Sequence, residues 1–135
     1  MSGGSSGAVD YAALAQFRHA LRQFLVFSER RAAEHGLTAQ QHQALLAIRG
    51  ADARQVTIGF VAERLVIKPH SASELVDRLE TLGLVSRAPS PRDRRQALIE
   101  LTTRSRALLE QLSATHSEEL RRLRPMLTAL LTQLE

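Results

Sequence analysis

Two short amphipathic segments separated by three residues constrain the middle of this chain most strongly. Thr57 is placed to cap a helix over residues 58–65, since a threonine hydroxyl accepts a hydrogen bond from an amide of the first helical turn. Pro69 suits the first position of a second helix over residues 69–82, and Gly83 suits its end. The pattern therefore predicts a helix-turn-helix.

The second of these helices has one apolar and one polar face. At about 100° per residue, its apolar stripe consists of Ala72, Leu75, Val76, Leu79 and Leu82, which we expect in the core. The outward face is free to contact a partner. It carries His70, Glu74, Asp77 and Thr81, flanked by Ser71, Ser73 and Arg78.

A basic hairpin follows the second helix. Residues 84–88 and 96–101 have strand character and flank a turn-rich loop, which predicts a β-hairpin that we call the wing. Residues 55–57 predict a further short strand. Between Arg87 and Arg95 there are four arginines and one aspartate, a net charge of +3 within a total of +4 for the whole chain. A solvated loop is the usual interpretation of such a run, but its place after a helix-turn-helix favours a nucleic-acid contact.

Two further helices are predicted before the helix-turn-helix. Residues 8–35 lack proline and glycine and repeat apolar side chains every three or four positions, which predicts one long helix ending before Gly36. Thr38 and Gln41 have the spacing of a capping box, so a second helix is expected from there to about Arg49.

The end of the chain is rich in leucine. One helix is predicted from residue 102 onward, and we expect Pro125 to break or kink it near Arg124. Several of its leucines would be exposed in a monomer, which favours a helical partner, most simply a second copy of the chain. An intramolecular bundle is the alternative. The residues assigned to a dimer contact are Leu14, Leu21, Leu120, Leu123, Leu127, Leu130 and Leu134.

Composition excludes several classes of protein. The 135 residues include no cysteine, which removes disulfides, thiolate catalysis and cysteine-based zinc sites. The five histidines lack the close spacing of metal-binding pairs, and the motifs of phosphate loops and catalytic nucleophiles are missing. We therefore expect no metal, no cofactor and no enzyme.

The longest apolar run, 44–48, is far below the roughly 20 residues of a membrane-spanning helix. We therefore expect a cytoplasmic protein of one globular domain, with residues 1–7 as a flexible tail.

A helix can read base edges in the major groove, while an arginine on a loop can enter the narrow minor groove. Arg94 or Arg95 is the candidate for that insertion. The cations are almost all arginine, the side chain that binds phosphates and base edges bidentately. The residues assigned to double-stranded DNA are Lys68, His70, Ser71, Ser73, Glu74, Arg78, Arg92, Asp93, Arg94 and Arg95.

Acidic side chains in this region need an explanation, because phosphates repel them. We expect Glu74 to pair with Arg78 one turn on, in preference to accepting a hydrogen bond from cytosine. Asp93 either pairs with a neighbouring arginine or caps the turn of the wing loop. The outward position of Glu74 and Asp77 also supports an alternative function, a protein-interaction module that keeps the winged-helix fold and has lost specific DNA binding.

Several motifs together resemble one family, the MarR family of bacterial transcription regulators. The resemblance covers about residues 8–135 and is most specific where Asp93-Arg-Arg95 is followed six residues later by Leu101-Thr102. It implies a mainly α fold, a winged helix-turn-helix with long terminal dimerisation helices and a small β-hairpin wing. It also implies a homodimer that binds a palindromic operator, represses transcription and is released by a small ligand. The other matching segments are Leu37-Thr38 with Gln41, Leu45-Leu46, and residues 57–65, 75–80, 83–87 and 90–95.

The resemblance further implies roles for segments and residues. Residues 69–82 would be the recognition helix, Arg78 a phosphate contact, and Asp93 with Arg95 the pair that places an arginine in the minor groove. The implied organisation is a tail over residues 1–7, a dimerisation region over 8–36 and 102–135, and a DNA-binding domain over 37–101.

Ligands of the family enter a cleft between the dimer helices and the winged domain, and typical effectors are aromatic acids or phenols. An arginine or histidine in such a cleft can pair with a carboxylate. Each candidate has a core or surface role as its alternative. The residues assigned to the cleft are Tyr11, Phe17, Arg18, His19, Phe27 and His42.

Overall fold

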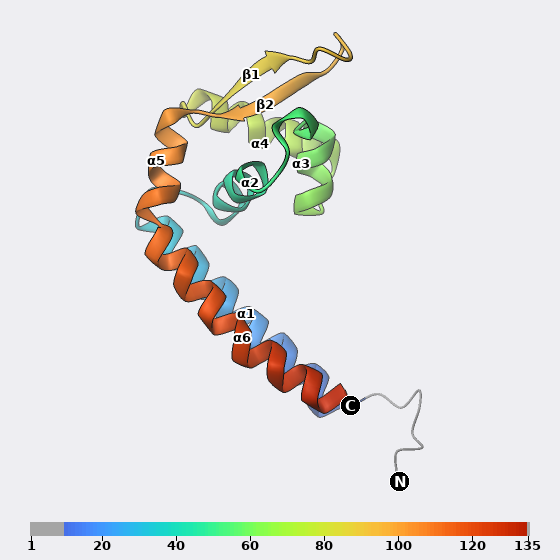
Figure 1. Cartoon of the computed structure of the whole chain (residues 1–135), viewed down its shortest axis with the longest axis vertical. Helices are drawn as coiled ribbons and strands as arrows, with labels where there is room; N and C mark the ends of the chain where they lie inside the picture. Colours follow the sequence, from blue (N-terminus) through green and yellow to red (C-terminus); the bar gives the residue numbers. More distant parts are fainter. Residues whose placement is uncertain (1–9, 135) are drawn as a thin grey trace. The chain divides into compact units, whose positions relative to one another are not determined.

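The computed structural model describes residues 10–134, which fall into two compact units. The helical unit comprises the described residues up to 30 and from 114 onward, and the winged-helix unit comprises residues 31–113. The predicted tail over residues 1–7 lies outside the described residues. In chain order (Figure 1), the elements are α1 (Tyr11–Ala33), α2 (Ala39–Arg49), the 3-10 helix η1 (Ala53–Gln55), α3 (Ile58–Leu65), α4 (Pro69–Thr81), β1 (Val85–Pro89), β2 (Ala97–Leu101), α5 (Thr103–Gln111) and α6 (Ser113–Leu134). Within residues 10–134, no helix has the length and apolar character needed to cross a membrane.

The helices of the winged-helix unit begin at the caps that the sequence predicts. The Thr38 hydroxyl accepts a hydrogen bond from the Gln41 amide at 3.1 Å, and the Gln41 side chain accepts one from the Thr38 amide at 3.0 Å. The Thr57 hydroxyl accepts from the Phe60 amide at 3.2 Å, and Pro69 is the first residue of α4. The capping box and the helix-turn-helix are therefore confirmed.

The turn between α3 and α4 contains a strained residue. Val66 has a φ of 54°, in the left-handed region that β-branched residues avoid, and its side chain is 89% exposed. The amide of Ile67 donates to the Ala62 carbonyl at 3.0 Å, and that of Val66 donates to the Glu63 carbonyl at 3.2 Å. Hydrogen bonds to the last turn of α3 thus hold the backbone where the two helices meet.

An apolar core joins α2 and α4 to the wing. Val76 and Leu79 of α4 are fully buried, as is Leu45 of α2, and they share one cluster with Ile99 of β2. Leu82 was expected in this core, but it is 40% exposed, because α4 ends at Thr81 and Leu82 forms its C-cap. The remaining fully buried aliphatic side chains of the cluster include Val56, Val61 and Leu112.

The wing is a two-stranded antiparallel hairpin, as predicted. Val85 pairs with Leu101 and Pro89 with Ala97. The predicted strand over residues 55–57 is wrong: residues 53–55 form η1, because the Asp52 side chain accepts a hydrogen bond from the Arg54 amide and tightens the chain. One strand-like hydrogen bond remains, from the Ile99 amide to the Val56 carbonyl at 2.8 Å. These contacts place the loop between α2 and α3 against β2.

The last part of the chain forms two helices where one was predicted. The break comes at Leu112, which caps α5 with its backbone and is fully buried in the core of the winged-helix unit. Pro125 does not end α6, which runs from Ser113 to Leu134 with the proline inside it. A proline lacks one amide hydrogen, so it removes a single hydrogen bond of the helical ladder and leaves the others in place.

Candidate nucleic-acid interface

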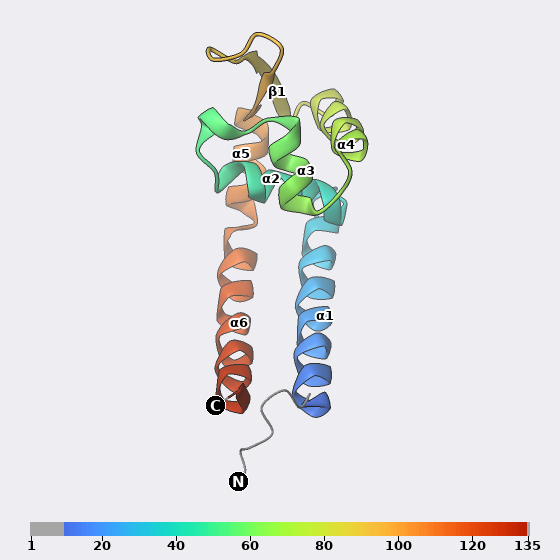
Figure 2. The ribbon, with the colours of Figure 1, turned by 90° about the vertical axis from the view of Figure 1, so that its right-hand side faces the viewer.

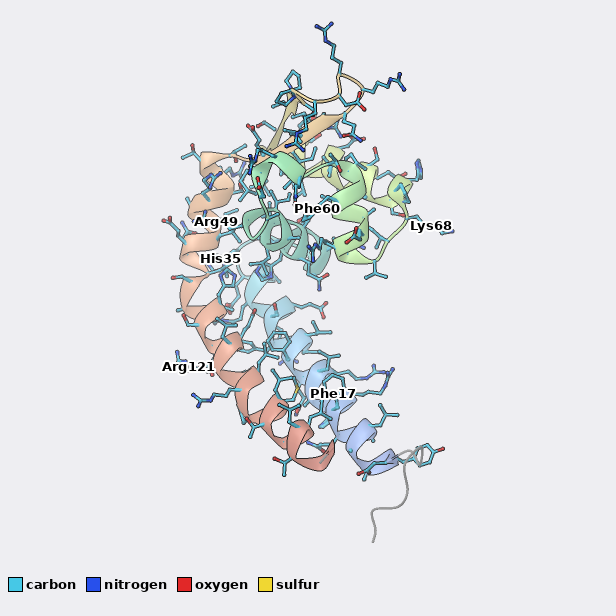
Figure 3. The ribbon with its side chains drawn as sticks, turned by 45° about the vertical axis from the view of Figure 1, so that its right-hand side comes forward. Phe17, His35, Arg49, Phe60, Lys68 and Arg121 are labelled. Atoms are coloured by element: carbon cyan, nitrogen blue, oxygen red, sulfur yellow. The ribbon has the colours of Figure 1, made fainter. Side chains whose placement is uncertain are left out.

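Helix α4 exposes its polar face beside the start of α2. Ser71, Glu74 and Arg78 line an open groove of about 1060 Å³, and Thr38 and Gln40 at the start of α2 form its other side. The sequence pointed to the side chains of α4 but not to Gln40. The capping box of Thr38 and Gln41 fixes where α2 begins, and it was the one signal in the sequence that could have placed Thr38 and Gln40 beside α4. Lys68 lies at the N-terminal end of α4 and is exposed (Figure 3).

The charge pairing on α4 differs from the prediction. Glu74 pairs with His70, at 3.0 Å between His70 Nε2 and Glu74 Oε1, and not with Arg78. Both residues lie one helical turn from Glu74, so spacing alone allows either pair. Among the described residues, Arg78 therefore has no ion-pair partner, and its exposed guanidinium is free for an external anion.

The wing loop, residues 90–96, exposes three guanidinium groups. Among the described residues, Arg92, Arg94 and Arg95 form no ion pair. Asp93 takes the second of its two expected roles: its Oδ1 accepts a hydrogen bond from the Arg95 amide at 2.9 Å and so caps the turn. Ser90 is nearly buried, and its hydroxyl accepts from the Arg92 amide at 3.3 Å. Backbone contacts thus shape the loop and leave its positive charges unneutralised.

Arg87 in β1 connects the wing to α4. Its Nη2 lies 2.6 Å from Asp77 Oδ1, and its Nη1 lies 3.5 Å from Glu80 Oε1. One arginine of the predicted basic cluster therefore faces the protein and offsets two acidic side chains of α4. Sequence analysis missed this role, because the partners are ten and seven residues away and meet only where β1 packs against α4. Figure 2 shows the wing and α4 at the same end of the unit.

A second charged pair lies in η1. Arg54 Nη2 is 2.9 Å from Asp52 Oδ2, and Arg54 Nε is 3.2 Å from Asp52 Oδ1. The pKa of Asp52 is lowered from 3.8 to about 2, first by hydrogen bonds from the Arg54 side chain and then from its amide, with a smaller contribution from the charge of Arg92. The wing loop is thus within electrostatic reach of η1. Nothing in the sequence indicated this pair beyond the two residues themselves.

Five of the six ligand candidates belong to the helical unit. Phe17 points toward α6 (Figure 3) and lines a small hollow of about 50 Å³ with Met126 and Leu130. His19 and Phe27 line a more open hollow of about 420 Å³, and Arg122 of α6 stacks over the Phe27 ring at 4.1 Å. Basic side chains missed by the sequence analysis, Arg22, Arg30 and Arg122, line this hollow as well.

The remaining ligand candidates lie elsewhere. Tyr11 and Arg18 are exposed on α1, and neither lines the hollow beside Phe27. His42 belongs to the winged-helix unit, where it is buried on α2. Within residues 10–134, no group of three or more histidine, aspartate or glutamate side chains could hold a metal ion.

The leucines assigned to a dimer contact are largely uncovered in the single chain. Leu14, Leu120 and Leu127 are exposed, and Leu21, Leu123 and Leu130 are half-buried. The side chain of Leu134 lies outside the described residues.

A helix-turn-helix with a basic hairpin packed beside its second helix defines the winged helix-turn-helix class. The MarR family model matches residues 35–96, and no curated protein matches the sequence. Solved structures share the fold. The MepR–DNA complex of Staphylococcus aureus has 21% identity and a TM-score of 0.72, covering 94% of this chain and 97% of that one. Apo MarR of Escherichia coli has 24% identity and a TM-score of 0.71, covering 94% and 98%. BpsR of Bordetella bronchiseptica, whose DNA binding is regulated by 6-hydroxynicotinic acid, has 23% identity and a TM-score of 0.66, covering 87% and 93%.

Residues 35–96 thus match the MarR family model, and the chain shares the fold of MarR structures. The predicted resemblance and the predicted fold class are both confirmed. The MarR family is one of transcription regulators and not of enzymes, in agreement with the prediction that this chain is not an enzyme.

The pair in η1 gives a direct test of the geometry. In the wild-type protein, the pKa of Asp52 is expected at about 2, and Arg54→Ala should return it toward 3.8. Because folding lowers this pKa, the pair stabilises the fold above about pH 4 and loses that contribution as the pH falls toward 2. Carboxyl chemical shifts followed by NMR between pH 1.5 and 6 measure both values. A wild-type Asp52 that titrates near 3.8 would contradict the pairing.

Proposed function

We propose that this chain is a homodimeric, DNA-binding transcription regulator of the bacterial cytoplasm that represses by binding a palindromic operator. The observation that carries the proposal is the set of guanidinium groups without ion pairs among the described residues: Arg78 on the exposed face of α4, and Arg92, Arg94 and Arg95 on the wing loop. Cations left unpaired at one end of a small domain are suited to phosphates. Structures of two relatives in fold, MepR and a MarR variant, are complexes with DNA and with operator DNA.

The arrangement supports a division of tasks between α4 and the wing. In the proposal, α4 lies in the major groove, where Ser71, Ser73 and His70 reach phosphates or base edges, and Lys68 and Arg78 bind backbone phosphates. The wing loop, capped by Asp93, presents Arg94 or Arg95 to the minor groove. Glu74 then keeps His70 in place and does not itself contact DNA.

The alternative, a protein-interaction module that has lost DNA binding, rested on acidic side chains exposed on α4. In the structure, Glu74 is paired with His70, and Asp77 and Glu80 are paired with Arg87. The acidic groups are therefore offset within the protein, while the arginines of the wing loop are not. This balance favours DNA over a protein partner.

A second copy of the chain is proposed because the helical unit has little core of its own. Among its described residues, only Ala13, Thr115 and Glu119 are buried, and Oε1 of Glu119 has no hydrogen-bond partner. Tyr11, Leu120 and Leu131 are 76%, 68% and 62% exposed. Two helices with so much uncovered apolar surface are stabilised by a symmetric partner that covers it.

A small ligand that releases the protein from DNA completes the proposal. The hollow beside Phe27 combines an aromatic ring with Arg22, Arg30 and Arg122, which suits an aromatic or phenolic ligand that carries a negative charge. His19 lines the same hollow. Phe17, Arg18, Tyr11 and His42 stay predictions as ligand contacts.

The first experiment measures binding to a duplex from the DNA upstream of the protein's own gene. Wild-type protein should bind it tightly and a random duplex weakly, with an affinity that falls steeply as salt rises. Arg95→Ala should lower the affinity for the upstream duplex by about 1–3 kcal/mol. Arg121→Ala, which removes an exposed cation from α6, is the control. Wild type and Arg95→Ala binding equally weakly, with no sequence preference, would overturn the proposal.

The dimer is tested by charging its proposed contact. Leu127→Asp combined with Leu131→Asp should give a protein that sediments as a monomer at micromolar concentration, because carboxylates cannot be buried against a second apolar helix. DNA affinity should fall with it, since one half-site alone binds weakly. Thr128→Asp on the same helix is the control and should remain dimeric. A double variant that still sediments as a dimer would place the interface elsewhere.

A further inference from the structure

The segment η1 lies beside the wing and outside the surface considered so far. Its following residue, Val56, accepts a hydrogen bond from the Ile99 amide in β2 at 2.8 Å, and Val56 is itself fully buried. η1 is therefore attached to the same hairpin that carries the wing loop (Figure 1). The backbone of η1 is thus held beside the hairpin whose loop carries Arg92, Arg94 and Arg95.

Arg54 is such a side chain, and it is held in an unusually defined way for an exposed group. Exposed ion pairs are generally worth little, because two mobile side chains must be ordered. Here the Arg54 amide, Nε and Nη2 all donate to the Asp52 carboxylate, at 3.0, 3.2 and 2.9 Å. The side chain is nevertheless 75% exposed. One edge of the guanidinium is thus fixed to Asp52, while Nη1 has no partner among the described residues.

A second cation acts on the carboxylate that holds Arg54. Arg54 is bonded to Asp52, and the charge of Arg92 acts on the same carboxylate from the wing loop. An external anion that binds the exposed edge of Arg54 would therefore also be attracted by the charge of Arg92. A phosphodiester group is such an anion, and the guanidinium fork matches its oxygens.

We propose that Arg54, together with Arg92, forms an additional phosphate-binding site for the DNA backbone at the flank of the wing. Arg54 offers its free Nη1 to a phosphate oxygen while Asp52 holds the opposite edge of the guanidinium. The site adds affinity and fixes the depth of the wing in the minor groove without reading a base. This inference rests on the proposed DNA-binding function.

The test compares Arg54→Ala with Arg121→Ala, since both remove an arginine that is 75% exposed and paired with one carboxylate. Affinity for the upstream duplex and for a random duplex is measured between 50 and 250 mM salt. Arg54→Ala should weaken both by a similar factor, about fivefold to tenfold at low salt, and should reduce the slope of log affinity against log salt by about 1. Arg121→Ala should leave both quantities at the wild-type value.

A conservative variant separates geometry from charge. Arg54→Lys keeps the positive charge but loses the planar fork that can serve Asp52 and a phosphate together. It should keep the wild-type salt slope and lose about threefold in affinity. Duplexes in which single phosphates beside the wing are replaced by neutral methylphosphonates locate the contact. One replacement should weaken wild-type binding and leave binding by Arg54→Ala unchanged.

The outcomes distinguish this inference from the function on which it rests. If wild type prefers the upstream duplex but Arg54→Ala matches Arg121→Ala, the phosphate site is wrong and the regulator stands. If Arg54→Lys equals wild type in affinity and every methylphosphonate affects wild type and Arg54→Ala alike, the cation acts only through general charge and the site is likewise wrong. If wild type binds neither duplex, both proposals fail.

Discussion

The Arg87 side chain, placed between Asp77 and Glu80, determines how the wing sits against α4. The apolar core supplies most of the stabilisation, since Val76, Leu79 and Ile99 lose nearly all their exposed surface in it. Apolar packing is not directional, however, and a hairpin of two short strands can pivot on it. The paired contacts of one guanidinium, at 2.6 and 3.5 Å, restrict that rotation. A wing that keeps its orientation can present its arginines at a constant distance from the exposed face of α4.

The contacts of Arg87 with Asp77 and Glu80 also change the charge that the surface presents to a ligand. Asp77 and Glu80 on α4 would repel a phosphate backbone, and Glu74 would add to that repulsion. Arg87 and His70 offset these charges inside the protein, so that Arg78 and the wing loop set the sign of the potential toward a ligand. A net charge of only +4 for the chain therefore understates how positive this end of the winged-helix unit is.

The two units differ in how much apolar surface they bury. The winged-helix unit has an apolar core of its own, whereas the helical unit leaves several leucines exposed.

Local signals in the sequence were sufficient to place the starts of three helices in the winged-helix unit. Thr38 with Gln41, Thr57 and Pro69 mark the starts of three helices through contacts within three residues, and such contacts do not depend on the rest of the fold. Of two predictions that failed, one depended on distant packing and the other on a local cap. The helix break at Leu112 arises because its side chain enters the core, and the 3-10 helix replaces a strand because Asp52 caps it.

In the candidate site as well, some features could be predicted from the sequence and others depended on tertiary contacts. The arginines of the wing loop and the polar face of α4 were visible in the sequence, because loops and outward faces are exposed whatever the details of packing. The partner of Glu74 was not, since His70 and Arg78 are both one turn away. Arg87 was counted among the outward charges, although tertiary structure turns it inward. Arg54 became a candidate only once β2 had placed η1 beside the wing.

The central claim is that α4 and the wing bind DNA as one rigid surface, and footprinting of the upstream duplex tests it most directly. Dimethyl sulfate reports guanine N7 in the major groove, and hydroxyl radicals report the sugars that border the minor groove. The account predicts adjacent protection of both grooves in each half-site, and it predicts that Arg87→Met, with its fold intact by circular dichroism, weakens both protections together. Protection of the major groove that survives Arg87→Met unchanged while the minor-groove protection disappears would contradict the claim, as would a wild-type protein with no localised footprint.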